Sequence, residues 1–382
     1  MSISSFFVFC AFNTFQPNVI SIFPEDARLA LGLLYCVYAF SNLIAPVLLP
    51  KISCNILFAF SFALYLADVF AGIIKNETLF LTVSVFTGFG SAIFWSTQGA
   101  FILHFSSNAS EAAELSSLFW SIFTFNAIVG FALSSVFHSI LEVSLETLML
   151  ILCGTGLIGV FMSLTLPFLK LKNKQNEGKP VSFATMFKFL ITKYRPLLLI
   201  SFLCGLYSPY FQSNWMEYVG DVWGQPVFLV WGSVEVLFAM FLSRMTKKKS
   251  FSNVTYLYYG VLFIVFALAL SSVQYLFTDT FSAIYFVIAV LYGVGDVLIN
   301  NMIPSCVSEY FNSTVTFGIS SFKFCQAFGY FVGFITPTVF PTIGLDVLSL
   351  INLVVALLAC ITLIRVFRLT SPAEFTDLPA SV

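Results

Sequence analysis

Charged residues are scarce in this chain of 382 amino acids. Asp, Glu, Lys and Arg together make up 9% of it, whereas 59% of the residues are hydrophobic and the net charge is -1. Soluble domains have about 25% charged and about 45–50% apolar residues, so this composition excludes a soluble globular class and predicts an integral protein of the lipid bilayer. The chain also lacks the strongly basic character of nucleic-acid-binding proteins, so we predict no nucleic-acid partner.

Residues that build catalytic and metal centres are also few. His104 and His138 are the only histidines and lie far apart, which disfavours a zinc site or a Ser-His-Asp triad. A Gly-rich phosphate loop of the Walker type is absent from the sequence. The eight cysteines lie mostly in apolar runs without a C-x-x-C pair, which predicts small buried residues rather than disulfides or metal ligands. We therefore predict no enzyme activity, no cofactor and no metal site.

Long apolar runs, by contrast, recur along the whole chain. A helix that spans a bilayer needs about 20 apolar residues. We predict an all-α membrane protein with twelve transmembrane helices near residues 4–22, 28–50, 52–74, 79–103, 114–138, 145–169, 196–218, 226–243, 254–275, 280–302, 315–340 and 345–367. The predicted domains are an N-terminal six-helix bundle at 1–169, a basic cytosolic loop at 170–195, a C-terminal six-helix bundle at 196–370 and a short cytosolic tail at 371–382.

The first apolar run begins almost at Met1, without the basic residues that open a signal peptide. Asn13, Gln16 and Pro17 also interrupt it. We expect a first transmembrane helix with little or no cytosolic tail, a pattern that an incomplete gene model would also produce. A signal peptide is the alternative.

Basic and acidic residues fall on opposite sides of the predicted helices. The basic side carries Lys51, Lys170, Lys172, Lys174, Lys179, Lys188, Lys193, Arg195, Arg244, Lys247, Lys248, Lys249, Arg365 and Arg368. Because basic connections stay in the cytosol, we predict that both termini are cytosolic, in either the plasma membrane or an endomembrane. Among four N-x-S/T sequons only Asn76 falls in an outward loop, so it is the candidate glycosylation site of a glycoprotein.

Two short motifs recur at almost the same offset. Gly88-Phe-Gly90-Ser91 matches Gly293-Val-Gly295-Asp296 after 205 residues, and Ser116-Ser117 matches Ser320-Ser321 after 204 residues. Such a repeat fits two parallel six-helix halves related by an axis along the membrane normal, with any substrate site near the midplane between them.

Several longer stretches carry a family resemblance. They are FNTFQ at 12–16, LYCVYAFSNLIAP at 34–46, GFGSAIFWSTQGAFI at 88–102, SLFWSIFTFNAIVG at 117–130, GSVEVLF at 232–238, LYGVGDVLINNMIP at 291–304 and FGISSFKFCQAFGY at 317–330. With these the chain resembles the UNC-93-type (ion channel regulatory protein) branch of the major facilitator superfamily, and within it the orphan major-facilitator-domain-containing subgroup. The resemblance implies a major facilitator fold. The loop at 49–53 departs from the G-x-x-x-D-R-x-G-R-[RK] pattern of sugar and drug carriers, which puts a classical carrier assignment in doubt.

Two charges lie inside apolar helices of the second half. Asp296 lies roughly 9 Å and Lys323 roughly 12 Å from the cytosolic ends of adjacent antiparallel helices. A charge in hydrocarbon needs a partner or water, so we predict an ion pair between them. The pair either fixes helix packing or acts as a gate or substrate contact.

Further polar residues extend this candidate site. Asn300 lies one turn from Asp296, and Gln326 lies one turn from Lys323. In the first half of the chain, Gln98 is the candidate site residue. Glu235 lies roughly 13 Å deep, without an obvious basic partner in the sequence. A carboxyl group buried in this way favours its protonated form, which makes proton coupling a hypothesis for Glu235.

Two functions fit these features. The first is a secondary transporter that moves a small solute, with or without a proton, through a cavity lined by Gln98, Glu235, Asp296 and Lys323. The alternative is a non-transporting adaptor that regulates or traffics another membrane protein such as a channel or receptor, because the resemblance includes proteins of that kind. Polar residues in both halves favour the transporter, whereas the segment 170–195 is a candidate contact for a partner.

Overall fold

A computed structural model describes residues 1–23, 26–134, 136–137, 141–171, 183–248, 251–276, 283–311 and 314–369. These residues are almost entirely helical. The helices are α1 (Ser2–Ile22), α2 (Ala27–Asn42), α3 (Ala45–Leu48), α4 (Cys54–Ile74), α5 (Glu77–Phe105), α6 (Ala109–Ser134), α7 (Leu145–Leu164), α8 (Phe183–Thr192), α9 (Arg195–Pro209), η2 (Tyr210–Trp215), α10 (Met216–Lys247), α11 (Asn253–Leu276), α12 (Ala283–Tyr310), α13 (Val315–Val339) and α14 (Leu345–Leu369). The predicted tail at 371–382, residues 172–182 of the predicted loop and the sequon at Asn312 lie outside the described residues.

Each of the twelve predicted segments coincides with a helix, because long apolar runs are the strongest signal in this chain. Several boundaries differ, since α12 continues to Tyr310 and α10 begins at Met216, before the predicted segment 226–243. Part of the predicted loop 170–195 is the helix α8, whose Met186, Phe189 and Leu190 are buried. The predicted boundary near 218–226 lies within α10, where Gly220 has a φ of 76° and interrupts the helical backbone.

Among the described residues, eight helices are long and apolar enough to cross a membrane. They are Cys54–Ile74, Glu77–Phe105, Ser110–Ser134, Leu145–Leu164, Pro226–Lys247, Asn253–Tyr275, Ala283–Tyr310 and Leu345–Ile364. The segment Arg195–Gly220, bent by 97° from α8, makes a ninth when the bent pair is taken as one span. The protein is therefore an all-helical, multi-pass membrane protein.

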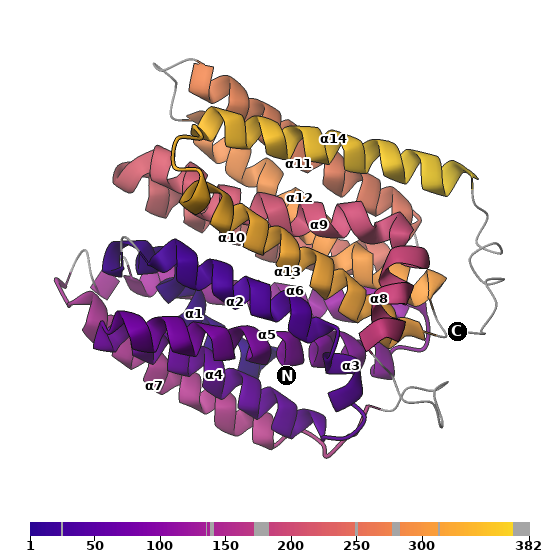
Figure 1. The fold of residues 1–382 in the computed structure, drawn as a ribbon, viewed down its shortest axis with the longest axis horizontal. Helices are drawn as coiled ribbons and strands as arrows, with labels where there is room; N and C mark the ends of the chain where they lie inside the picture. The colour runs from indigo at the N-terminus through magenta and orange to yellow at the C-terminus, as the bar shows by residue number, and fades with distance from the viewer. Residues whose placement is uncertain are drawn as a thin grey trace.

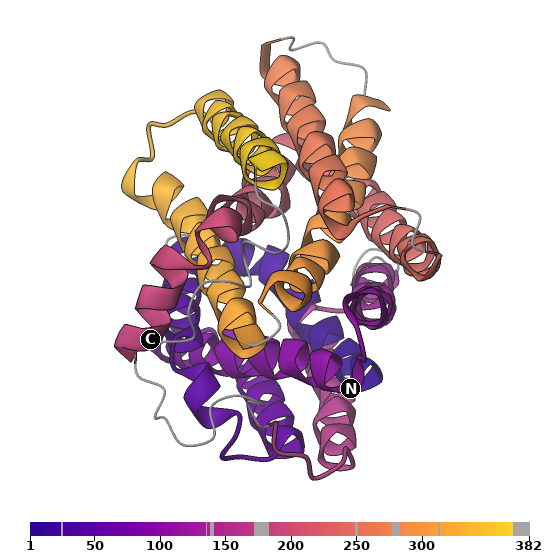
Figure 2. The same ribbon diagram turned by 90° about the vertical axis from the view of Figure 1, so that its right-hand side faces the viewer.

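The helices form two groups that follow the order of the chain. In Figures 1 and 2 helices α1–α7, drawn in indigo and magenta, lie on one side, and α9–α14, drawn in pink, orange and yellow, lie on the other. Within the groups α2 packs on α5, α1 on α7, α9 on α13, and α11 on α12. The groups meet where α6 packs on α10 and α2 packs on α13.

The repeated Gly-x-Gly motif has equivalent neighbours in the two groups. Gly88 packs against α2, and its counterpart Gly293 packs against α10. Gly90 packs against α4, and its counterpart Gly295 packs against α11. Equivalent glycines therefore face equivalent helices, as the sequence repeat predicts.

Helices α9 and α13 approach each other more closely than side chains would allow. A Cβ atom on Gly205 would collide with the carbonyl oxygen of Gln326, and one on Gly329 would collide with the carbonyl oxygen of Phe202. Small residues at a helix interface permit such close backbone contact in membranes. This contact fixes the position of Gln326 beside the candidate site.

Candidate functional site

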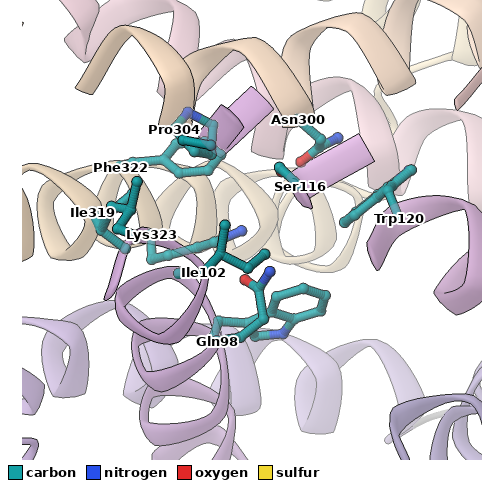
Figure 3. A pocket seen from close by; sticks show the side chains of 13 residues that line it. Gln98, Ile102, Ser116, Trp120, Asn300, Pro304, Ile319, Phe322 and Lys323 are labelled. Carbon is teal, nitrogen blue, oxygen red and sulfur yellow. The ribbon is translucent and has the colours of Figure 1, made fainter. Parts of the chain in front are cut away.

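A cavity lies between the two groups of helices. Its lining residues come from α5, α6, α12 and α13, and are Trp95, Gln98, Gly99, Ile102, Leu103, Ala112, Ser116, Trp120, Asn300, Pro304, Ile319, Phe322 and Lys323. Figure 3 shows the amino group of Lys323 extending between Gln98 on one side and Asn300 on the other. The cavity thus brings together three of the residues predicted from the sequence, one from the first half and two from the second.

Aromatic contacts join the halves beyond this cavity. The rings of Tyr35 and Tyr330 stack with centroids 4.4 Å apart, and those of Phe131 and Phe228 stack at 4.6 Å. Tyr330 lies about two helical turns beyond Lys323, toward the C-terminal end of α13. The cavity therefore lies nearer the opposite end of the bundle, where α5 ends and α13 begins.

Lys323 is buried and held by one amide and two aromatic rings. Its Nζ donates to Oε1 of Gln326 at 2.8 Å. The same nitrogen lies 4.6 Å from the ring centroid of Trp95 and 4.4 Å from that of Phe322. Cation–π contacts of this kind attract an ammonium group to an aromatic face, and more strongly where water is excluded.

Asp296 is the acceptor at the other end of the site. Its Oδ1 accepts hydrogen bonds from the Tyr207 hydroxyl at 2.9 Å and from Asn300 Nδ2 at 3.0 Å. Gln326 Nε2 in turn donates to Asn300 Oδ1 at 2.9 Å and contacts Cys204 Sγ at 3.2 Å. The hydrogen-bond donors needed by a buried carboxylate are therefore supplied by α9 and by α12 itself.

Glu235 reaches the same carboxyl group from α10. The indole Nε1 of Trp231 donates to Glu235 Oε1 at 2.9 Å. The Glu235 carboxyl group also lies close enough to that of Asp296 for the two to interact. Two carboxyl groups in contact cannot both carry a charge without strong repulsion, so such a pair holds one proton readily.

The structure differs from the predicted direct ion pair. Among the described residues ion pairs within 4.0 Å join Arg28 to Glu217, Lys75 to Glu146 and Lys247 to Glu114, and none includes Asp296 or Lys323. The amides of Asn300 and Gln326 stand between the two charges and connect them by hydrogen bonds. A depth estimate places two residues at similar levels of the bilayer but does not show which side chains meet.

Several site residues lacked a sequence signal. Cys204 and Tyr207 of α9 and Trp231 of α10 contact the polar cluster, but such residues are common in apolar helices. Asp68, which is equally buried, belongs to a different place: it accepts a hydrogen bond from Ser84 at 2.9 Å inside the first group of helices. Within the described part of the chain, no cluster of three or more His, Cys, Asp or Glu side chains could hold a metal ion.

Comparison with known families agrees with this architecture. The model of a family described as ion channel regulatory protein UNC-93 matches residues 17–364. The chain belongs to the UNC-93 family. The UNC93-like protein MFSD11 of Xenopus tropicalis is 30% identical over 138 residues, and that of Xenopus laevis is 28% identical. In both cases the match covers 34% of this UNC-93 family chain and 31% of the relative, so the chain spans about a third of the length of the relatives it matches.

Solved structures show the fold of this UNC-93 family member. The human organic anion transporter MFSD10 (TETRAN) superposes with a TM-score of 0.65 and 13% identity, over 95% of this chain and 96% of that one. FucP in the outward conformation, a major facilitator superfamily transporter, gives a TM-score of 0.64 and 16% identity, over 95% and 97%. A second structure of FucP, the fucose:proton symporter of E. coli, gives the same TM-score, identity and coverage. The fold is therefore that of the major facilitator superfamily.

Proposed function

We propose that this protein is a secondary-transporter-like carrier that moves a small solute through its central cavity. The observation that carries this proposal is the position of the cavity between the two groups of helices, with Gln98 from one and Asn300 and Lys323 from the other. Transporters of this fold bind substrates at that interface and alternate access by rocking one half against the other. The stacked aromatic residues beyond the cavity are suited to act as the closed gate of one such state.

The Glu235–Asp296 pair is the proposed coupling site. Two neighbouring carboxyl groups offer a place where one proton is gained or lost inside the bilayer. Asp296 is linked through Asn300 and Gln326 to Lys323, which lines the cavity. A change of charge at the carboxyl pair therefore alters the field at the solute site, which is what coupling of solute and proton movement requires.

The number of membrane spans and their orientation are also part of this proposal. Twelve spans require that α1, α2 with α3, and α13 also cross, although these helices are not among the candidate spans. These helices pack against the candidate spans α5, α6 and α7. The proposed topology also includes two six-helix halves at 1–169 and 196–370, with both termini in the cytosol.

The proposed topology places Asn76 on the outer side of the membrane. Asn76 is exposed at a two-residue connection, and its Oδ1 accepts a hydrogen bond from the Leu79 amide.

Uptake by the purified protein in liposomes tests transport and coupling. With a panel of small solutes and an imposed proton gradient, we expect gradient-stimulated uptake that is lost when Glu235→Gln and Asp296→Asn are combined. Asp68→Asn is the matched control, because Asp68 is a buried carboxyl group outside the site. Stimulation that survives the double change would refute the coupling role. Failure of every solute to accumulate would refute transport.

A second candidate function is regulation of an ion channel. It is favoured by the description of the family, ion channel regulatory protein UNC-93. In this case the chain would act as an adaptor bound to another membrane protein. Purification in mild detergent decides between the candidates, because an adaptor would retain a stoichiometric membrane partner and show no solute uptake.

A further inference from the structure

The cavity contains one charged side chain. Of the residues that line it, only Lys323 is ionisable, and it is 6% exposed. Its ammonium group has three N–H donors, and one of them is used by Gln326 Oε1. The aromatic rings beside it attract its charge but offer no oxygen acceptor. Hydrogen-bond donors of Lys323 are therefore available at the cavity wall.

Two further donor groups line the cavity. One is the side-chain amide of Gln98, a residue that is 7% exposed. The indole nitrogen of Trp120 is buried and has no partner among the described residues. Buried polar groups without partners cost free energy. A ligand that accepts hydrogen bonds from Gln98, Trp120 and Lys323 would remove that cost.

The carboxyl groups of the site do not reduce this preference. Asp296 and Glu235 lie behind the cavity wall, and Tyr207, Asn300 and Trp231 already donate to them. Asn300, the wall residue between them and the cavity, has its Nδ2 directed to Asp296 and its Oδ1 engaged by Gln326. A ligand in the cavity therefore meets a cation and free donors, whereas the nearest anion is covered.

The rest of the lining is apolar. Ile102, Leu103 and Ile319 contribute aliphatic side chains, and Trp95 and Phe322 contribute aromatic rings. A strongly hydrated inorganic ion would leave these surfaces uncovered, whereas a small molecule with an apolar body would bury them.

We propose that the cavity binds a small organic anion, with its acidic group at Lys323, Gln98 and Trp120 and its apolar body against the surrounding rings and aliphatic side chains. This inference rests on the proposed solute-binding role of the cavity. It names the chemical class of that solute.

Binding to the purified full chain tests the charge preference directly. Three probes of similar size are benzenesulfonate, benzyl alcohol and benzylammonium, which are anionic, neutral and cationic. Because hydrogen bonds between charged groups are stronger than those between neutral groups, we expect benzenesulfonate to bind at least about ten-fold more tightly than the other two in calorimetric titrations. Equal binding of the three probes, a preference for benzylammonium, or no binding of benzenesulfonate would overturn the inference.

Variants test which residues produce the preference for the anionic probe. Lys323→Gln is expected to weaken benzenesulfonate binding about ten-fold or more, and Gln98→Leu to weaken it by a smaller factor. Lys247→Gln is the control, because it removes a lysine that is exposed and paired with Glu114 on the surface. Unchanged affinity in a Lys323→Gln variant with the parent melting temperature would overturn the assignment. If that variant does not fold, the probe series on the unmodified chain decides alone.

Uptake measurements separate this inference from the proposed function. Binding of benzenesulfonate together with a failure of every solute to accumulate in liposomes supports the inference and contradicts transport. Uptake of neutral or cationic solutes without binding of benzenesulfonate supports transport and overturns the inference.

Discussion

Two neutral amides stand between the charged ends of the site. Lys323 donates to Gln326, Gln326 donates to Asn300, and Asn300 donates to Asp296. Since each amide offers both an oxygen acceptor and an NH₂ donor, the hydrogen bonds run in one direction from the ammonium group to the carboxyl group. Such bonds polarise one another, so the two charges influence each other without direct contact.

A double-mutant cycle measures this influence. We expect the combination of Asp296→Asn and Lys323→Gln to be less destabilising than the sum of the single changes, by about 0.5–3 kcal/mol, because residues of one hydrogen-bond network are not independent. The free energy of unfolding in mixed micelles is the measurement. Lys323→Gln combined with Lys247→Gln, which lies on the surface, should be additive. Additivity in the first pair would show that the amides do not connect the charges.

Asn300 is the branch point of this network. Its side chain bonds to Asp296 and to Gln326, so Asn300→Ala removes one hydrogen bond from each of two buried polar groups. We expect a loss of about 1–3 kcal/mol in the free energy of unfolding. Asn352→Ala is the matched control, because the Asn352 amide donates to Leu348 of its own helix, and about 1 kcal/mol or less is expected there. Equal costs for the two variants would contradict the assigned role of Asn300.

The sequence identified polar residues of the site but not their partners. The sequence singled out four of them, namely Asp296, Asn300, Lys323 and Gln326. Polar side chains are costly inside an apolar membrane helix, so their presence there indicates a structural or functional role. The contact between Glu235 and Asp296 was not predictable, since it depends on how α10 packs against α12. Helix rotation decides which side chains meet, and no local pattern in a single sequence records it.

At the scale of elements, one backbone contact supports the cluster. Gly205 of α9 and Gly329 of α13 allow the two helices to touch, and the contact lies directly beside Gln326. The position of α13, and with it that of Lys323, therefore depends on two residues without side chains.

Enlarging either glycine should separate these helices. We expect Gly205→Ala to lower the free energy of unfolding by about 1–3 kcal/mol, the usual cost of overpacking. The control is Gly154→Ala in α7, where an added methyl group meets no atom within 4 Å. There we expect unchanged or slightly higher stability, because alanine favours a helix more than glycine does. A Gly205→Ala variant as stable as the control would argue against the close contact.

The long helices could be predicted from the sequence. The twelve predicted segments all correspond to helices, since each has a sustained apolar run. The short elements could not be predicted from the sequence. Helix α3 has four residues, α8 lies inside a polar stretch, and Tyr210–Trp215 is a π-helical turn within a continuous helical segment. In these places tertiary packing decides the backbone, and periodicity over a few residues carries too little information.

At the scale of the whole molecule, charged pairs mark its two ends. Lys75 pairs with Glu146 where α4 ends and α7 begins, whereas Lys247 pairs with Glu114 where α10 ends and α6 begins. Helix α5 runs from Glu77, beside the first pair, to Phe105, close to the second. If the molecule spans the bilayer along its helices, the two pairs lie on opposite sides of the membrane, with the Lys247 end in the cytosol by the distribution of basic residues.

Labelling of single cysteines tests both the orientation and the number of spans. Glu77 and Lys248 are exposed at these two ends, and five proposed spans separate them, namely α5, α6, α7, Arg195–Gly220 and Pro226–Lys247. We expect a membrane-impermeant maleimide to label Glu77→Cys on intact cells, and to label Lys248→Cys only after the membrane is opened. The parent chain corrects for native Cys36, the one cysteine that is not buried. Labelling of Lys248→Cys alone would reverse the orientation. Labelling of both on intact cells would mean that an even number of segments crosses between them, and the bent segment Arg195–Gly220 would then not be a span.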